Sequence, residues 1–305
     1  MSAGDKRDRA LEKKRRYLRL LEGFPVKLIA TKAKGRHLVA SKPLEPGTTV
    51  IHETASAYAI LKSYIDELCY TCLHPLPEAP PSSDTNSSST PFGPTRHSQF
   101  KKQFECQNCR SQIYYCSPEC RTKDAPRHSL ECDILKDLPG TAAANSVDYG
   151  LMRLVLAILV RRAMDGNEDL KEEANGNTSH RPPTPYTCVK DLLSHKSSSK
   201  PSWLSAVEAG AEDLAFQLSP SLSTSVDEIV TLSCQINSNS HGIRDPLGNT
   251  NADIAVGLFP LVAMLNHSCL PNCAYVGVGH GQMLVRTLRE VEEGEELCVS
   301  YVDLY

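Results

Sequence analysis

The feature that most constrains this chain is a set of eight potential metal ligands between residues 69 and 132. They form four pairs, which are Cys69 and Cys72, Cys106 and Cys109, Cys116 and Cys120, and His128 and Cys132. A two-residue gap lets a tight turn aim two thiolates at one ion, and a three-residue gap places both ligands on one face of a helix. Eight ligands make two tetrahedral sites with no position open for water or substrate. We therefore expect two structural zinc ions.

Other interpretations of these cysteines are chance clustering, a disulfide framework and buried free thiols. Seven of the twelve cysteines fall in this one segment at ligand spacing, which weighs against all three. The first thirty residues hold no uninterrupted apolar core of a signal peptide, and nowhere do eighteen apolar residues run together. We expect a soluble chain in the nucleus, the cytoplasm or both, with no membrane partner and with reduced cysteines.

Charge and hydropathy divide the 305 residues into successive segments. The first fifty residues hold thirteen Lys and Arg against five Asp and Glu, and their apolar spacing predicts a short helix over residues 11–22. A basic face of this kind is most often solvated, with nucleic-acid binding and nuclear import as the other interpretations. Short β-rich runs follow at 26–31 and 48–52, separated by turn formers.

The middle of the chain alternates between polar stretches and helical patterns. Residues 73–105 carry six prolines among many Ser and Thr, which predicts a disordered insertion because too little apolar surface is available for a core. Apolar residues three and four positions apart predict an amphipathic core helix from Val147 to Met164, and a further helix is expected near 204–218. A flexible loop is expected from 166 to 201. The last fifty residues return to short strands.

The order of the ligand pairs, with the run from Tyr115 to Cys120 and the final His-x3-Cys, resembles the MYND zinc finger. The resemblance implies that the pairs interleave, with Cys69, Cys72, Cys116 and Cys120 on one ion and Cys106, Cys109, His128 and Cys132 on the other. The 33 residues between Cys72 and Cys106 exceed the link usual in that family. Closing a longer loop costs only on the order of 0.6 kcal/mol per doubling of its length.

Two later runs, Leu265 to Cys273 and Gly294 to Tyr301, resemble the two signature segments of the SET domain, and the run from Lys34 to Leu38 resembles its opening segment. A SET domain split by a MYND finger is typical of the SET and MYND domain family of protein lysine methyltransferases. The resemblance implies an α+β fold, in which a β-rich SET domain is split by an inserted two-zinc MYND finger and a helical segment.

The resemblance also implies a division into five segments. These are a basic N-terminal helix (1–23), the first part of the SET domain (24–68), the MYND finger with its disordered insertion (69–132), a helical SET insert with flexible loops (133–250), and the SET core with the catalytic tyrosine (251–305).

Membership of this family implies S-adenosylmethionine as methyl donor and a lysine of a histone or another protein as acceptor. Carried over by position, the residues implied beside the cofactor are Lys34, Gly35, Arg36, Asn239, Asn266 and His267, and the tyrosine at the methyl-transfer centre is Tyr301. Methyl transfer needs mainly alignment of a neutral amine with the methyl carbon and exclusion of water. The phenol of Tyr301 can orient that amine by hydrogen bonding.

The sequence departs from the family at several positions. His37 stands where glycine is usual, and His241 stands where an aromatic ring such as Phe is common. The family's cysteine-rich segment after the tyrosine is not found before the chain stops at Tyr305, so we expect Cys269 to be a free thiol and the lysine channel to lack part of its wall. The isolated Cys188, Cys234 and Cys298 are expected to be small buried hydrophobic residues.

Two further functions remain open at this point. The chain would be a non-catalytic adaptor if the finger binds proline-containing peptides and the SET region serves only as a scaffold. It would be a nucleic-acid-binding regulator if the basic N-terminus binds a duplex, which predicts steeply salt-dependent binding.

Overall fold

The structure is a computed structural model that describes residues 3–77, 104–110, 112–166, 183–245 and 252–302. The chain divides into two compact units. Unit 1 comprises Met1–Glu53, Pro260–Gly277 and Gln282–Tyr305, and unit 2 comprises Thr54–Phe259 and Val278–Gly281. Unit 1 is therefore built from both ends of the sequence and unit 2 from its middle. Within the described ranges, no helix has the length and hydropathy needed to cross a bilayer.

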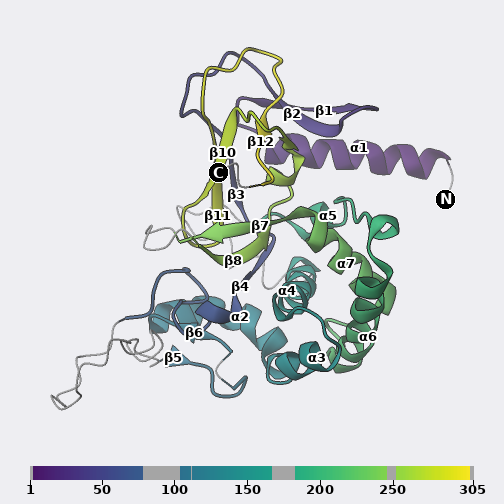
Figure 1. The fold of residues 1–305 in the computed structure, drawn as a ribbon, viewed down its shortest axis with the longest axis vertical. Helices are drawn as coiled ribbons and strands as arrows, with labels where there is room; N and C mark the ends of the chain where they lie inside the picture. The colour runs from purple at the N-terminus through teal and green to yellow at the C-terminus, as the bar shows by residue number, and fades with distance from the viewer. Residues whose placement is uncertain (1–2, 78–103, 111, 167–182, 246–251, 303–305) are drawn as a thin grey trace. The chain divides into compact units, whose positions relative to one another are not determined.

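Unit 1 combines a long N-terminal helix with short strands (Figure 1). Its elements are α1 (Ala3–Leu20), β1 (Val26–Thr31), β2 (Gly35–Ala40), β3 (Thr49–Thr54), the 3-10 helix η5 (Val262–Met264), β9 (Asn266–His267), β10 (Cys273–Gly277), β11 (Gln282–Thr287) and β12 (Cys298–Val299). Among the fully buried side chains that these strands and the segments beside them contribute are Leu38, Val50, Ile51, Val285 and Leu297.

The strands of unit 1 pair within hairpins and between the two ends of the sequence. β1 and β2 form an antiparallel hairpin whose turn ends at Gly35, which has φ +66°, a conformation that favours glycine. β3, from the N-terminal part, joins the C-terminal hairpin in the order β10-β11-β3. β9 pairs in parallel with β12, so that Asn266 lies opposite Cys298 and His267 opposite Val299. This pairing lays the two predicted signature segments side by side.

Unit 2 combines helices with short sheets. Its elements are β4 (Ala57–Ile60), η1 (Lys62–Tyr64), β5 (Phe104–Glu105), β6 (Tyr114–Tyr115), α2 (Pro118–Leu135), α3 (Leu138–Ala144), α4 (Tyr149–Gly166), α5 (Tyr186–Val189), η4 (Lys196–Ser198), α6 (Pro201–Gln217), α7 (Val226–Asn239), β7 (Ser240–Arg244) and β8 (Asp253–Leu258). The sheet order is β4-β8-β7, and β5 pairs with β6.

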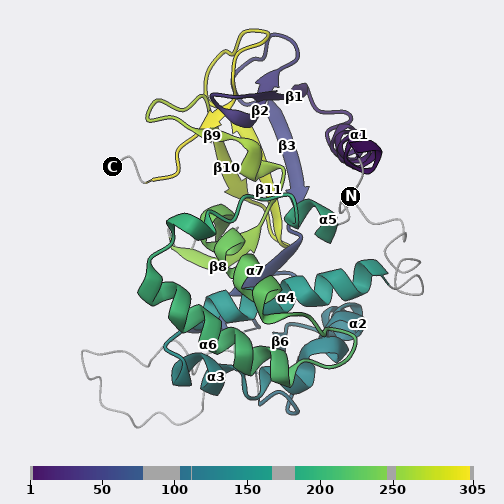
Figure 2. The same cartoon turned by 90° about the vertical axis from the view of Figure 1, so that its right-hand side faces the viewer.

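Helix α4 forms the centre of unit 2. Every residue from Met152 to Val160 is buried, because α2, α3, α7 and the sheet strands β4 and β8 pack around it (Figure 2). A helix that is apolar on all sides is a core helix rather than a surface helix with one buried stripe. The polar exception in this stretch is Arg153, which is also buried.

The α+β fold is confirmed, and most predicted elements lie within a few residues of the observed ones. The predicted strand 26–31 is β1, and the predicted helices over 147–164 and 204–218 are α4 and α6. The predicted helix over 11–22 is α1, which begins earlier, at Ala3, and ends at Leu20. Helices α3 and α7 were not predicted, because their short or mixed apolar patterns resemble loops.

Two stretches, 73–105 and 166–201, were predicted to be flexible. Residues 78–103 of the predicted insertion lie outside the described residues, whereas Leu73 and Leu76, at its start, are buried. Residues 167–182 of the predicted loop over 166–201 also lie outside them. For residues 183–200 the expectation of a flexible loop was wrong, since this stretch forms α5 and η4 and buries Cys188 and Val189.

Candidate functional site

The eight predicted metal ligands gather into two groups in unit 2. One group is Cys69, Cys72, Cys116 and Cys120, and the other is Cys106, Cys109, His128 and Cys132. Within each group all the ligand atoms lie within 4.8 Å of one another. The structure thus places the ligands in the interleaved arrangement that the resemblance implies.

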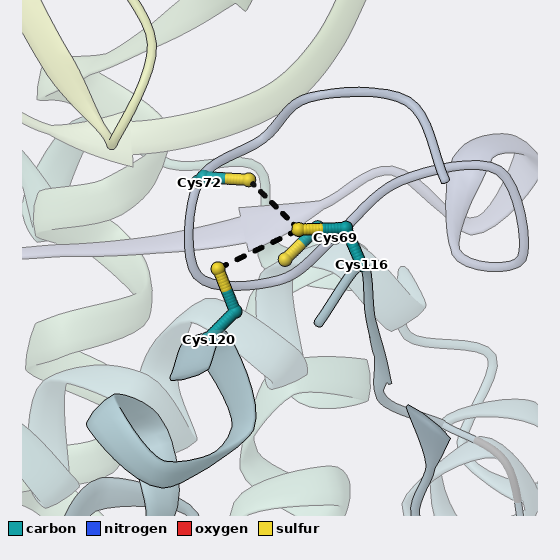
Figure 3. A group of neighbouring side chains, drawn as sticks. All are labelled: Cys69, Cys72, Cys116 and Cys120. Carbon is teal, nitrogen blue, oxygen red and sulfur yellow. Dashed lines mark hydrogen bonds between the residues drawn. The ribbon is translucent and has the colours of Figure 1, made fainter. Parts of the chain in front are cut away.

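In the first group the four sulfur atoms point toward one another (Figure 3). The Sγ atom of Cys116 lies 3.7 Å from that of Cys72 and 3.5 Å from that of Cys120. Zinc bonds of about 2.3 Å in a tetrahedron require sulfur atoms about 3.8 Å apart. The observed spacing therefore fits one zinc ion, with four protein ligands and no open position.

Local structure explains how the first group forms. Cys69 and Cys72 flank a tight turn closed by the bond from Leu73 N to Cys69 O, at 2.9 Å. Cys120 lies in the first turn of α2, whose N-cap Ser117 accepts a hydrogen bond from Cys120 N at 3.2 Å. The expectation that a helix carries both Cys116 and Cys120 was wrong, because Cys116 precedes the cap and follows strand β6.

The second group has similar dimensions. The Sγ atoms of Cys106 and Cys132 lie 3.6 Å apart, and Cys109 Sγ lies 3.8 Å from Nε2 of His128. His128 and Cys132 come from one face of α2, as their spacing predicts. The two thiols Cys106 and Cys109 come from the turn between β5 and β6, where Arg110 takes φ +53°. This geometry also fits a tetrahedral ion.

Hydrogen bonding prepares each group for a cation. The hydrogen bond from Cys72 lowers the pKa of the Cys69 thiol to about 5. In the second group, burial opposes ionisation of Cys106, but hydrogen bonds from His128 and from its neighbouring cysteines lower the pKa of this thiol to about 6. Each group thus has one thiol whose pKa is lowered toward the thiolate, the form that binds metal.

A buried charge network lies beside the second group. Glu131, which is 0% exposed, accepts two hydrogen bonds from Arg153, from Nη1 to Oε2 at 2.9 Å and from Nη2 to Oε1 at 2.8 Å. Arg127 Nη1 donates to Glu131 Oε1 at 2.5 Å, and Arg127 also pairs with Asp124. Burial alone would raise the pKa of Glu131, but the charges of Arg127 and Arg153 outweigh it and hold this pKa well below its usual value.

Two of the predicted cofactor residues of unit 1, Lys34 and Asn266, meet at Glu296. The Nδ2 atom of Asn266 donates to the side chain of Glu296 (Oε1) at 2.8 Å and lies 3.4 Å from the carbonyl oxygen of Lys34. The ammonium group of Lys34 forms an ion pair with the other oxygen of Glu296. Residues from the opening segment and from both signature segments thus share one hydrogen-bonded cluster.

The predicted catalytic residue adjoins this cluster. The hydroxyl of Tyr301 donates to the carbonyl oxygen of Leu265 at 2.7 Å, and its backbone N–H donates to Nδ1 of His267 at 3.0 Å. The rings of His267 and Tyr301 lie 5.5 Å apart. Desolvation raises the pKa of Tyr301 above its ordinary value, so the phenol keeps its proton at neutral pH. It is therefore a hydrogen-bond donor rather than a base.

The remaining residues of the opening segment have different surroundings. Apart from Gly35 and its two neighbours in the chain, no atom of the described residues lies within 4 Å of the position that a Cβ would take on Gly35, so the chain there faces open space. The guanidinium of Arg36 instead lies 3.5 Å from the hydroxyl of Tyr17 in α1. His37 is buried in β2, and the positive φ falls on Gly35, so a histidine is accommodated where the family has glycine.

Asn239 belongs to unit 2, whereas the cluster around Asn266 belongs to unit 1. Asn239 ends α7, and its Nδ2 donates to the carbonyl oxygens of Leu193 and Gln235, both at 2.8 Å. His241 lies in β7, edge-on to Phe259 with ring centroids 6.2 Å apart.

The predicted free thiol Cys269 is exposed, and its Sγ lies 3.3 Å from Nε2 of His267. Cys188 and Cys234 are buried as expected, whereas Cys298 is only partly buried.

Sequence reasoning missed the carboxylates that organise unit 1. Glu296 holds both Lys34 and Asn266, and it lies within a predicted signature segment without having been assigned a role. Glu53 is buried and accepts the N–H groups of Leu261 and Val262 at 3.0 Å, which fixes the start of η5 just before Asn266. The available sequence signal for Glu53 was its place directly after the β-rich run at residues 48–52. Its partners lie about 200 residues away, where no spacing pattern can point.

Comparison with known proteins agrees with this architecture. A model of the SET domain matches residues 35–302. The mouse (Mus musculus) histone-lysine N-methyltransferase SMYD3 is 26% identical over 291 residues, which cover 93% of this chain and 56% of that protein. A SET and MYND domain-containing protein of Dictyostelium discoideum is 23% identical over 304 residues, covering 92% of this chain and 55% of that one. The chain thus spans about half the length of the curated relatives it matches.

The fold is also similar to a crystal structure of the SET domain of LSMT bound to lysine and AdoHcy. The alignment covers 97% of this chain and 54% of the LSMT chain. Its TM-score of 0.42 and identity of 10% are too low to add to the assignment. The family match extends over most of the sequence and includes Asn266, Glu296 and Tyr301. The chain therefore belongs to the SET domain family, and its relatives in that family include SET and MYND domain-containing proteins.

Proposed function

We propose that this chain is an S-adenosylmethionine-dependent protein lysine N-methyltransferase that also holds two structural zinc ions. One observation carries the proposal: the opening segment and both signature segments of a SET domain contribute polar side chains to one cluster, around Asn266 and Glu296. Histone lysines or lysines of other proteins would be the acceptors, since similar proteins such as SMYD3 are named for that activity.

The cluster suits the methionine end of S-adenosylmethionine, which carries an ammonium and a carboxylate group. Lys34 offers a cation, Glu296 a carboxylate and Asn266 an amide that both donates and accepts hydrogen bonds. The open space at Gly35 lets a ligand approach the backbone. When bound, the cofactor would supply an electrophilic methyl carbon on a sulfonium. Asn266 and His267 are proposed to contact it, with Lys34 and Gly35 beside it.

Tyr301 is proposed to orient the substrate amine. Its phenol is neutral and already donates a hydrogen bond to the main chain next to Asn266. The substrate lysine has an ordinary pKa near 10.4 and must lose a proton before its lone pair can attack. A fixed hydroxyl can align that lone pair with the methyl carbon, and alignment is the main requirement of a one-step displacement.

Calorimetry with S-adenosylmethionine on the zinc-loaded chain tests the proposal, and we expect one binding site per chain. In a methylation assay, Tyr301→Phe should lower turnover about 10- to 1000-fold, with cofactor affinity within about twofold of the wild type, because a lost hydrogen bond in the transition state acts on the chemical step. Leu288→Ala, which removes another exposed side chain of unit 1, serves as the control. Absence of cofactor binding would favour the adaptor function, and undiminished turnover in Tyr301→Phe would exclude the assigned role.

Other partners and locations are subordinate proposals. The exposed Lys14, Arg15 and Arg19 on α1 supply positive charge that nucleic acid would attract, and flat or absent binding to a duplex would exclude this partner. Proline-containing peptides at the finger, and residence in the nucleus or cytoplasm, follow from the family resemblance.

A further inference from the structure

The buried acid next to the second metal group faces a metal ligand as well as its arginines. Glu131 lies three residues after His128 in α2, and its Oε1 is 3.8 Å from Nδ1 of His128. The other ring nitrogen, Nε2, faces Cys109 Sγ at the same distance, on the side where the ligand atoms converge. Nδ1 is buried, and in the described part of the chain it has no hydrogen-bond partner. The imidazole therefore has one nitrogen toward the ion position and the other toward the acid.

The acceptor capacity of Glu131 matches this arrangement. An ionised carboxylate offers about four lone-pair positions. Three are used by the guanidinium groups, two by Arg153 and one by Arg127. Oε1 already accepts one hydrogen bond from each arginine, so the remaining position is on Oε2. Nδ1 of His128, 3.8 Å from Oε1, would reach it through a small rotation of the carboxylate or the ring. Histidines that bind metal commonly donate their second N–H to a carboxylate, which fixes both tautomer and ring orientation.

We propose that Glu131 is a positioning residue for the Cys106–Cys109–His128–Cys132 site, which accepts the Nδ1 proton of His128 so that Nε2 faces the metal, and that Arg153 holds Glu131 in place from α4. This inference rests on the zinc binding proposed above. It concerns how tightly the second ion is held rather than the methyl transfer itself.

The position of Arg153 gives the proposal a structural consequence. Arg153 is buried in the core helix of unit 2, 22 residues from Glu131 along the sequence. Arg127 and Arg153 also lie over the ring of Tyr70, at 4.0 and 5.1 Å from its centroid. Tyr70 stands between Cys69 and Cys72, the ligands of the first group. The finger is thus tied to α4 through the same side chains that support its histidine ligand, and it is not an independent module.

A simpler role for Glu131 is that of a counter-ion for two buried arginines. The two roles differ in what they do to the two ions. Loss of a counter-ion lowers the stability of the whole network and affects both metal groups together. Loss of a positioning residue loosens one site, because only His128 loses its support. The rate at which each ion leaves therefore separates the two roles.

The test uses the full chain loaded with zinc and follows zinc release to a colorimetric chelator. We expect two equivalents in the wild type. In Glu131→Gln one equivalent should leave about 10 to 100 times faster, while the other keeps its wild-type rate. Arg153→Lys keeps the charge but loses the bidentate contact with Glu131, so it should speed the release of the same zinc equivalent by a smaller factor. Glu228→Gln is the control. Glu228, like Glu131, pairs with an arginine, here Arg162, and it also accepts a hydrogen bond from Tyr186, but it lies outside both metal groups.

Cobalt loading identifies the ion that leaves. Its ligand-field bands differ between a four-sulfur site and a site of three sulfurs and one nitrogen, and we expect only the latter bands to decay faster in Glu131→Gln. Equal acceleration of both equivalents, or unchanged rates in a folded variant, would overturn the proposal. If Glu131→Gln does not fold, unchanged rates in Arg153→Lys overturn it.

The same preparation separates this proposal from the wider function. Fewer than two zinc equivalents in the wild type would overturn both the zinc assignment and the role of Glu131. Failure to bind S-adenosylmethionine, with both zinc equivalents present, would overturn only the methyltransferase proposal.

Discussion

The metal finger of unit 2 and the cofactor cluster of unit 1 are built in opposite ways. The finger has a buried centre: Cys69, Cys109 and Glu131 are each 0% exposed, and every charge in the network has a partner at hydrogen-bond distance. Its other cysteines, apart from the buried Cys72, are partly buried. The cluster is open, since Tyr301 is 60% exposed and the side chain of Lys34 is 56% exposed. A site that gives its ion four protein ligands is closed to other ligands, so it can hold structure but offers no position for a substrate. An open cluster can receive a ligand, and its residues add little to stability before the ligand binds.

The largest effect should follow from removing a ligand of the closed site. Cys109→Ser should lower the zinc content from two equivalents to one and disorder the turn between β5 and β6, because the free energy of metal binding, about 10–16 kcal/mol for structural zinc, is also folding free energy. Elemental analysis and amide hydrogen exchange measure the two effects. Cys269→Ser, which changes an exposed thiol outside both metal groups, should retain two equivalents. A Cys109→Ser chain that still holds two ions would show that the ligand set is wrong.

The finger and the cluster also differ in how much of each could be predicted from the sequence. Ligand pairs such as Cys69 and Cys72 are encoded by local spacing, so all eight candidate ligands were identified without a structure. They gather into the two interleaved groups that the family resemblance, rather than spacing, implies. The support of the finger was not predictable. Glu131 meets Arg153 across 22 residues, and an arginine within an apolar helical run looks like part of a polar edge rather than a buried partner.

For the open cluster the sequence offered even less. Asn266, Lys34 and Tyr301 have no spacing rule that joins them, and only a resemblance to known signature segments suggested that they share a site. Glu296 remained unassigned because acidic residues near a turn are ordinary on protein surfaces. Its role emerges only when β9 and β12 pair in parallel and bring position 296 beside Asn266.

A second prediction concerns a partly buried imidazole in unit 2, that of His241. Burial lowers the pKa of His241 to about 4 from an ordinary value near 6.5. The folded chain keeps this ring neutral while the unfolded chain takes up a proton below pH 6.5, so stability is complete above that pH and falls as the pH drops toward 4. Between pH 7.5 and 5 the loss from this residue should be about 2 kcal/mol.

His241→Phe removes the titration while keeping an aromatic ring beside Phe259. The free energy of unfolding, measured in urea at both pH values, should therefore favour the variant by about 2 kcal/mol more at pH 5 than at pH 7.5. Because each protein is compared with itself across pH, packing differences cancel. A difference between the two proteins that does not change with pH would show that the ring of His241 is protonated in the folded chain as readily as in the unfolded one.

The smallest effect is expected in the open cluster, and it sharpens the contrast with the finger. In the wild type, the carboxylate of Glu296 pairs with Lys34 and accepts a hydrogen bond from Asn266. Glu296→Gln keeps the shape of this side chain but removes its charge. Partly exposed ion pairs contribute about 0–1 kcal/mol to stability, so the unfolding free energy and the zinc content should hardly change. The affinity for S-adenosylmethionine should fall about three- to tenfold, or about 0.7–1.4 kcal/mol, because the amide of Asn266 loses its orientation.

Glu293→Gln is the matched control for this variant, because Glu293 lies in the same segment and pairs with Lys27 at 3.4 Å, with both side chains 59% exposed. It should leave cofactor affinity unchanged, and calorimetry on the two variants side by side measures the difference. If both variants bind S-adenosylmethionine as the wild type does, Glu296 orients nothing that the cofactor contacts. If Glu296→Gln instead lowers stability by several kcal/mol, the cluster is a structural support like the network around Glu131, and the distinction between a closed site and an open one fails.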